Sequence, residues 1–78
     1  MARFYFDFQD ANGILRDEAG EELLSATVAK EEALKTAGQM IGDLAGRHTE
    51  GRVLIEVRDG DGPVLRVSAT VETAILKG

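Results

Sequence analysis

The sequence predicts a two-layer α+β domain in the order β-β-α-β-β, with an antiparallel-rich sheet and one long helix packed on one face. Three observations predict it. Residues 3–9 alternate between apolar and polar side chains, residues 26–45 repeat their apolar positions with helical spacing, and residues 52–69 alternate again around an Asp-Gly turn. Two hairpins flanking one helix are typical of the α+β class. The 78 residues suffice for one domain, which we assign to residues 1–78.

The first predicted strand carries every phenylalanine of the chain. Its alternation places them on one face, opposite Tyr5: they are Phe4, Phe6 and Phe8. We expect this face to form the centre of the core, covered by the N-terminal half of the helix. Asn12-Gly13 follows and is the strongest short hairpin signal, because both residue types tolerate positive φ. A second strand over residues 14–17 should therefore run back antiparallel to the first.

Residues 17–23 combine four carboxylates with a glycine, which indicates an acidic loop. We expect Leu23 and Leu24 to return from it to the core. Ser25 then provides a good N-cap for a helix from Ala26 to Ala45. The apolar stripe of this helix consists of Ala26, Ala29, Ala33, Ala37, Met40, Ile41 and Leu44.

The end of the helix and the second hairpin complete the predicted fold. Gly46 suits the left-handed position that follows a helix C-terminus. Residues 52–58 form the third predicted strand, with Val53, Ile55 and Val57 on one face, and residues 59–62 form a turn. The fourth strand begins at Pro63 and runs to residue 69. For residues 70–78, both a helix and an extended segment fit the pattern, and we favour a short helical end.

Composition excludes several classes of function. The chain contains no cysteine and a single histidine, His48, so neither a disulfide nor a conventional zinc site is expected. The net charge of −5 disfavours nucleic acid and anionic membranes as partners. No secretory signal or membrane span is visible, which favours a cytoplasmic protein. Small domains often need a further source of stability, and a homodimer is the remaining one.

The acidic residues offer two candidate sites. The turns at residues 10–13 and 59–62 carry oxygen ligands that suit calcium, but the fifth and sixth places of a calcium loop hold Ile14 and Leu15 after Asp10. Hairpin turns explain these residues without a metal. The second candidate is a carboxylate cluster on the loop, which reads as a solvated surface or a docking site for a basic protein: Asp17, Glu18, Glu21 and Glu22. With no nucleophile motif and no phosphate loop, we expect no catalytic residue, no cofactor and no enzyme activity.

Two surfaces are candidates for an interface. Gly38, Gly42 and Gly46 recur every four residues on the side of the helix opposite the apolar stripe, where each interior glycine costs about 1 kcal/mol relative to alanine. A closely packed partner helix would explain Gly38 and Gly42; otherwise they are simply tolerated. Tyr5 and Leu54 belong to the sheet face that the helix leaves open. We expect a dimer contact across this open face or along an edge strand.

The same residues carry a resemblance to a known family. It rests on five segments: Arg3-Phe4-Tyr5-Phe6, the turn from Asp10 to Gly13, Asp17-Glu18-x-Gly20-x-Glu22-Leu23, Glu32-Ala33-Leu34 and the later hairpin. In these segments the chain resembles a family of small bacterial proteins known only as a domain of unknown function. The family is abundant in rhizobia and related alphaproteobacteria. The resemblance covers nearly the whole chain and implies no catalytic residue. The helix glycines and the Leu24-Ser25 entry depart from it.

The chain is also similar, more weakly, to antitoxin-like domains with a degenerate nuclease-type βαβ fold. These share an N-terminal hairpin and a helix of the Glu-Glu-Ala-Leu type, here residues 31–37. That resemblance implies a basic toxin as partner, although the chain lacks a visible DNA-binding extension. We therefore expect a non-enzymatic module that binds protein or self-associates. Two alternatives stay open: an antitoxin-like binder of a basic partner, and a weak metal or small-molecule binder that uses the acidic turns.

Overall fold

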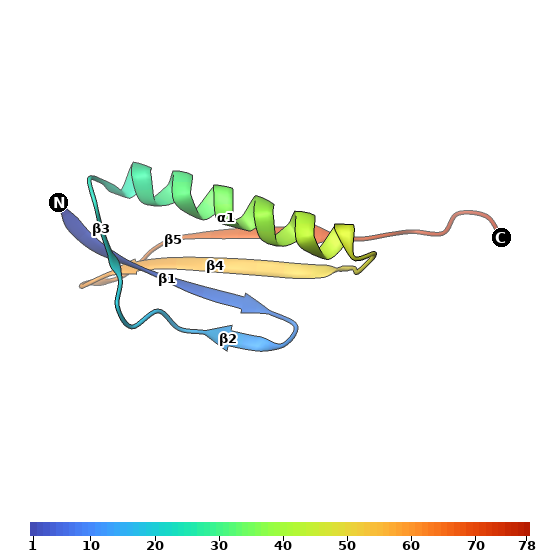
Figure 1. Cartoon of the computed structure of the whole chain (residues 1–78), viewed down its shortest axis with the longest axis horizontal. Coiled ribbons are helices and arrows are strands. Elements are labelled where there is room, and N and C mark those ends of the chain that lie inside the picture. The colour runs from blue at the N-terminus through green and yellow to red at the C-terminus, as the bar shows by residue number, and fades with distance from the viewer.

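The computed structural model describes residues 1–78 as one sheet with one helix across it (Figure 1). The elements follow in the order β1 (Ala2–Asp10), β2 (Gly13–Leu15), β3 (Glu21–Leu23), α1 (Ala26–Gly46), β4 (Gly51–Asp59) and β5 (Gly62–Val71). All strand pairs are antiparallel, and the sheet order is β2-β1-β4-β5. The predicted α+β class and the two-layer arrangement are confirmed.

One edge of the sheet is made of two short strands. β3 pairs with the beginning of β1, from Ala2 to Phe4, and β2 pairs with its end, from Phe8 to Asp10. Residues 16–20 bridge the gap between them. The second strand is therefore shorter than the predicted residues 14–17, and the loop expected over residues 17–23 contains the additional strand β3. Three residues are too few to show a periodic pattern, which is why β3 could not be recognised.

α1 begins as its sequence predicts but ends differently. The Ser25 side chain accepts a hydrogen bond from the Val28 N–H at 3.3 Å, which satisfies one unpaired donor of the first turn. At the other end Gly46 still belongs to the helix, and His48 takes the left-handed conformation, with φ of 60°. Placing the left-handed residue at Gly46 was therefore wrong. Histidine is among the non-glycine residues that tolerate this conformation best.

The core lies between α1 and the second hairpin. Ala29, Ala33 and Ala37 bring the helix close to the sheet, where Val53, Ile55 and Val57 are fully buried. α1 packs against β4 and β5, not across β1, as Figure 1 shows. Phe4 is buried, but Phe6 and Phe8 are only half-buried. The phenylalanine face is thus the margin of the core and not its centre.

Three further expectations are corrected. Leu24 is 76% exposed, because β3 ends at Leu23 and the chain turns outward to the helix cap. Ala26 is likewise exposed at the first turn of α1. Residues 72–78 continue beyond β5 without forming a helix, and their apolar side chains have no helical face to pack against.

As for membrane crossing, α1 does not combine the length and the apolar character that a bilayer-spanning helix needs.

The outer surface of α1 yields a first prediction. A Cβ atom added at Gly38 or Gly42 would meet no atom within 4 Å. The double variant Gly38→Ala/Gly42→Ala should raise the free energy of unfolding by up to about 1 kcal/mol for each site, through helix propensity. Chemical denaturation measures this effect, and light scattering on the same samples reports self-association. A weakened dimer without any gain in stability would contradict the expectation and place an interface on this face.

Candidate functional site

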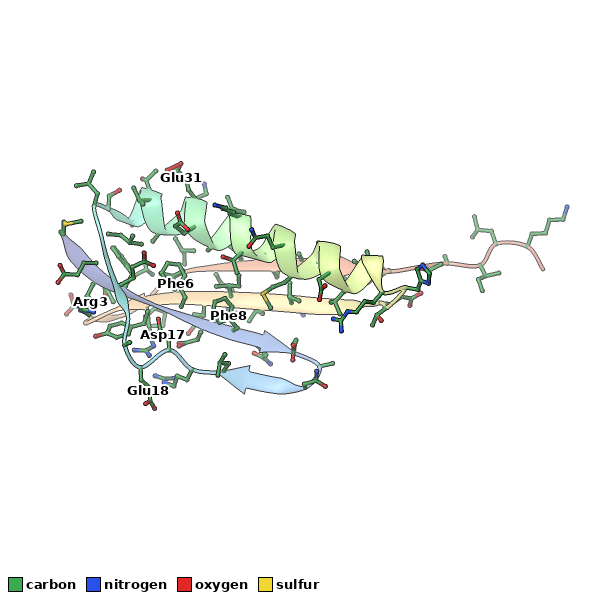
Figure 2. All side chains as sticks on the ribbon, in the orientation of Figure 1. Arg3, Phe6, Phe8, Asp17, Glu18 and Glu31 are labelled. Carbon is green, nitrogen blue, oxygen red and sulfur yellow. The ribbon has the colours of Figure 1, made fainter.

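A groove opens on the helix side of the sheet, between α1 and the β1–β2 hairpin. Its volume is about 590 Å3, and Phe6, Phe8 and Leu15 supply its apolar surface. Figure 2 shows Phe6 and Phe8 between β1 and the helix. A second hollow of about 480 Å3 continues along the hairpin to Met40 and shares Phe8 and Leu15 with the first. Together they form one elongated groove, which exists because α1 lies over β4 and β5.

The rim of the groove is acidic. Glu18 comes from the segment that joins β2 to β3, Glu21 is the first residue of β3, and Glu32 comes from α1. None of these three carboxylates forms an ion pair within the chain. Arg16 is the one cation of the lining. The groove therefore combines an apolar floor with an excess of unpaired negative charge at its margin.

Asp17 holds the loop between β2 and β3, which forms one wall of the groove. One oxygen of its carboxylate accepts hydrogen bonds from the N–H groups of Ala19 at 3.1 Å and Gly20 at 3.0 Å, and these bonds hold the loop in a tight turn. The other oxygen accepts from the Phe6 N–H at 3.1 Å. That N–H lies on the edge of β1 in the gap between β2 and β3, so a side chain supplies the acceptor where no strand does.

A second carboxylate, Asp7, fixes the base of the loop. Asp7 is 8% exposed although it points to the sheet face away from α1. One carboxylate oxygen accepts from the Asp17 N–H at 2.9 Å, and the other accepts from Arg58 Nε at 2.9 Å. Arg58 Nη2 also donates to the Asp17 carbonyl at 2.6 Å, and its guanidinium lies 4.5 Å from the centre of the Tyr5 ring. Every polar atom buried in this cluster has a partner.

The electrostatics of the cluster favour the charged forms of all three side chains. Burial would raise the pKa of Asp7, but the hydrogen bonds from Arg58 and from the Asp17 N–H outweigh it and lower that pKa. Backbone hydrogen bonds from Gly20 and Phe6 lower the pKa of Asp17. The hydrogen bond to Asp7 raises the pKa of Arg58. These shifts favour the ionised cluster at neutral pH.

Gly20 completes the loop for a steric reason. Its φ is +73°, and a Cβ atom there would stand 2.8 Å from Tyr5 Cε2 and 2.9 Å from Arg3 Cγ. Only glycine fits such a position without displacing its neighbours. Arg3 adds a further tie, because its Nη1 donates to the Ala19 carbonyl at 2.8 Å.

Comparison with known proteins assigns the chain to a family. Residues 3–70 match the family model described as a domain of unknown function, DUF6894. This chain belongs to the DUF6894 family. The match includes all of the groove and the Asp7–Arg58–Asp17 cluster, and it confirms the expected resemblance to a domain of unknown function. No curated protein and no solved structure matches the chain.

The residues predicted as an interface lie on two separate surfaces of this DUF6894 domain. Gly38 and Gly42 are exposed on the outer side of α1. Tyr5 is half-buried under Arg58 on the opposite side of the molecule, and Leu54 is half-buried farther along the same sheet face, where it pairs with Gln9. The structure does not bring the four together, and their role in an interface stays a prediction.

In the acidic turns of the DUF6894 domain, the Asp side chains already accept hydrogen bonds from the backbone of the turn. Asp10 accepts from the Asn12 N–H and Asp59 accepts from the Asp61 N–H, each at 2.8 Å. In both turns the Asp side chain accepts from the N–H two residues on, which is a common Asp turn. Nowhere do three His, Asp or Glu side chains converge as metal ligands would. Of the carboxylate cluster predicted on the loop, Glu18 and Glu21 line the groove beside Asp17, whereas Glu22 pairs with Arg3.

The sequence left two features of the site unrecognised. The pairing of Asp7 with Arg58 joins residues 51 positions apart, which no local pattern shows. The one available signal was Asp7 itself, a carboxylate in the middle of an aromatic strand. The second feature is the partial exposure of Phe6 and Phe8, which depends on where the helix lies and not on the strand's own period.

The Gly20 packing predicts a specific loss of stability. Gly20→Ala should lower the free energy of unfolding by more than about 1 kcal/mol, because the new methyl group collides with Tyr5 and the positive φ becomes strained. Gly60→Ala is the matched control, since its Cβ would meet nothing within 4 Å and its φ is not in the left-handed region. Urea denaturation of both variants measures the difference. Equal stabilities for the two would contradict the packing described here.

The buried cluster predicts how stability depends on pH. Asp7 and Asp17 have lowered pKa values in the folded state, so their stabilising contribution is complete above the unfolded value of about 3.9 and is lost as the pH falls through the folded values. Asp7→Asn should lower the free energy of unfolding at pH 7 by about 3 kcal/mol, since Arg58 loses its anion. The same substitution should also make the free energy of unfolding fall less steeply below about pH 4 than it does in the wild type.

Denaturant unfolding at a series of pH values measures both effects. Asp61→Asn serves as the control, because the Asp61 side chain is exposed and accepts no hydrogen bond. Acid limbs of identical slope in the wild type and in Asp7→Asn would refute the assignment.

Proposed function

We propose that this DUF6894 domain is a non-enzymatic protein-binding module whose groove binds a short protein segment rich in apolar and basic side chains. The observation that supports it best is the uncovered phenylalanine surface: Phe6 and Phe8 remain half-buried although they face the helix side of the sheet. In a chain with only nine buried residues, leaving two of its three phenylalanines partly exposed forgoes a substantial part of the available core.

The apolar surface extends beyond the phenylalanines. Leu15 is 70% exposed at the mouth of the groove, beside Phe8, with which it pairs across the two strands. Contiguous apolar surface bordered by polar groups is typical of protein-interaction sites. A partner's leucine or phenylalanine side chain would complete this part of the core.

The charge around the groove defines the chemistry of the partner. The unpaired carboxylates of Glu18, Glu21 and Glu32 border the apolar floor, so lysine or arginine side chains next to the apolar anchor would be attracted there. An acidic segment would be repelled by the same groups. This selectivity agrees with the net charge of −5 and with the basic partner that the sequence leaves open as an alternative.

The wall of the groove is held in place before any partner arrives. Asp17 binds three backbone N–H groups, and Arg58 ties the same loop to β1 through Asp7. A loop that is already ordered loses little conformational entropy on binding, which favours affinity. Because these ionised groups are saturated by their own hydrogen bonds, they serve to position the wall and not to catalyse a reaction.

The alternatives draw on the same surfaces. An antitoxin-like role, with a basic toxin as the partner, is favoured by the acidic rim and would use the groove in the same way. Metal binding by the acidic turns is disfavoured, because Asp10 and Asp59 already accept hydrogen bonds from their own turns.

Selection from a displayed library of random dodecapeptides tests the proposal. We expect the enriched sequences to combine large apolar residues with lysine or arginine, and we expect their affinity, measured by fluorescence polarisation, to depend on the groove. Glu32→Lys should weaken binding about tenfold, which corresponds to about 1.4 kcal/mol. Leu15→Asp should weaken it at least as much.

The chain offers a matched control for each variant. Glu31 neighbours Glu32 but does not line the groove, and Figure 2 shows its side chain on the far side of α1. Leu24 is as exposed as Leu15 but lies outside the groove. Glu31→Lys and Leu24→Asp should therefore bind like the wild type. Enriched peptides that lack basic residues, or that bind all four variants equally, would refute the proposal.

A further inference from the structure

We infer that the free edge of β5 is a homodimer contact, in which the β5 strands of two copies pair antiparallel and join their sheets into one. This inference is independent of the groove, which lies at the other edge of the sheet. It names a second copy of this chain as the partner. The backbone, an adjoining apolar flank and the distribution of charge support it in turn.

The two edges of the sheet differ in how they end. At the β1 edge, β2 and β3 occupy both ends of the strand, and the Asp17 carboxylate takes the Phe6 N–H between them. At the other edge β5, the longest strand of the domain with ten residues, pairs only with β4. The outward N–H and C=O groups of β5 therefore have no strand partner. A long unpaired edge of this kind is a ready template for another strand.

β5 carries the features that protect such an edge in monomeric proteins only at its beginning. Its proline, Pro63, lies at the second residue, and the irregularity in its pairing lies beside Val57 and Arg58 near the same end. Residues 64–71 continue without a proline. Their single charge, on Arg66, is paired with Glu56 at 2.8 Å. Protective edges instead carry charged residues, prolines or bulges along their length.

The helix supplies an apolar flank beside this edge. Glu32, Thr36 and Met40 face the groove, so helical geometry places Leu34 and Ile41 on the opposite flank, above β5. Leu34 is 51% exposed and Ile41 is half-buried. Beneath them, the helix-facing side chains of β5, Leu65 and Val67, are also only half-buried. An incoming strand with its own helix would cover all four.

The distribution of charge favours a second copy at this edge. The unpaired carboxylates Glu18, Glu21 and Glu32 lie on the groove side, so two chains of net charge −5 can meet at β5 without bringing these groups together. A two-fold axis pairs each β5 with itself, and identical apolar flanks then match. Residues 64–71, which follow Pro63, can share about eight hydrogen bonds when they pair in this way, and that number lies within the range of a standard protein interface.

Light scattering and site-directed crosslinking on the full chain test this inference. We expect the wild type to have a solution mass near twice 8.4 kDa, from a dimer that dissociates only on dilution. The chain has no cysteine, so an introduced one reports a single position. Ser68 is exposed in the middle of the β5 edge region, and Ala11 is exposed in the β1–β2 turn. With a short bismaleimide, Ser68→Cys should give a linked dimer in high yield, and Ala11→Cys should remain monomeric.

A surface variant separates the dimer from the groove. Leu34→Lys/Thr70→Lys changes one exposed residue of α1 and one of β5. It should weaken self-association at least tenfold, with an unchanged circular dichroism spectrum and unchanged binding of the peptides selected on the groove. Glu32→Lys should do the reverse. A wild-type chain that remains monomeric at millimolar concentration would overturn the inference. A dimer in which Ser68→Cys is crosslinked no better than Ala11→Cys would also overturn it. The same holds if β5 pairs only with a strand of a different protein and not with a second copy of this chain.

Discussion

The ionic cluster of Asp7, Arg58 and Asp17 is the constraint on which the rest of the structure depends. It joins β1 to β4 across 51 positions of sequence, and through the Asp17 carbonyl and N–H it also holds the loop between β2 and β3. Removing charges from water costs several kcal/mol for each ion, so such a cluster adds modestly to net stability even when it is complete. Its effect is geometric. It fixes the register of β1 against β4 and sets the position of the groove wall. Tyr5 and Gly20 extend the same arrangement by packing: the Arg58 guanidinium lies 4.5 Å from the centre of the Tyr5 ring, and the edge of that ring leaves no room for a Cβ atom at Gly20.

The lateral position of α1 accounts for both proposed surfaces. Alanines at 29, 33 and 37 let the helix sit close to the flat, β-branched surface of β4 and β5, where Val53, Ile55 and Val57 are completely covered. A helix placed there cannot also cover β1, so Phe6 and Phe8 remain at the margin of the core. The same placement leaves Leu34, on the flank of α1 away from the groove, 51% exposed. The groove on one side and the apolar flank on the other are therefore two consequences of a single packing choice.

Much of the fold follows from local chemistry, and the exceptions are instructive. Signals that lie within a few residues each identified an element: the alternation of residues 3–9, the Asn12-Gly13 hairpin signal, the Ser25 cap and the valine-rich pattern of β4. The turn of that hairpin is formed by residues 11 and 12, since Gly13 already pairs with Asp10. β3 was missed because a three-residue strand has no period of its own, and it exists only because β1 offers a free edge there. The helix end was assigned to Gly46, although His48 takes the left-handed position. For the site, the acidic wall was visible as a cluster at residues 17–22. The groove was not, since its floor depends on the lateral position of the helix, which the pattern of a strand does not encode.

Pairing through β5 would give the groove a further property. In an antiparallel continuation of a sheet the two-fold axis runs perpendicular to the sheet, so both helices lie on the same side. The two grooves then lie on that side too, at the far edges of the joined sheet, because each borders β1 and β2 while β5 is at the centre. A partner that presents two basic, apolar segments on one surface would engage both grooves at once, and linked binding of this kind can exceed the affinity of a single site by about 10²–10⁴. A partner with one such segment would gain nothing from the dimer. The spacing of the two grooves, and not only the chemistry of each, would then determine which proteins this domain selects.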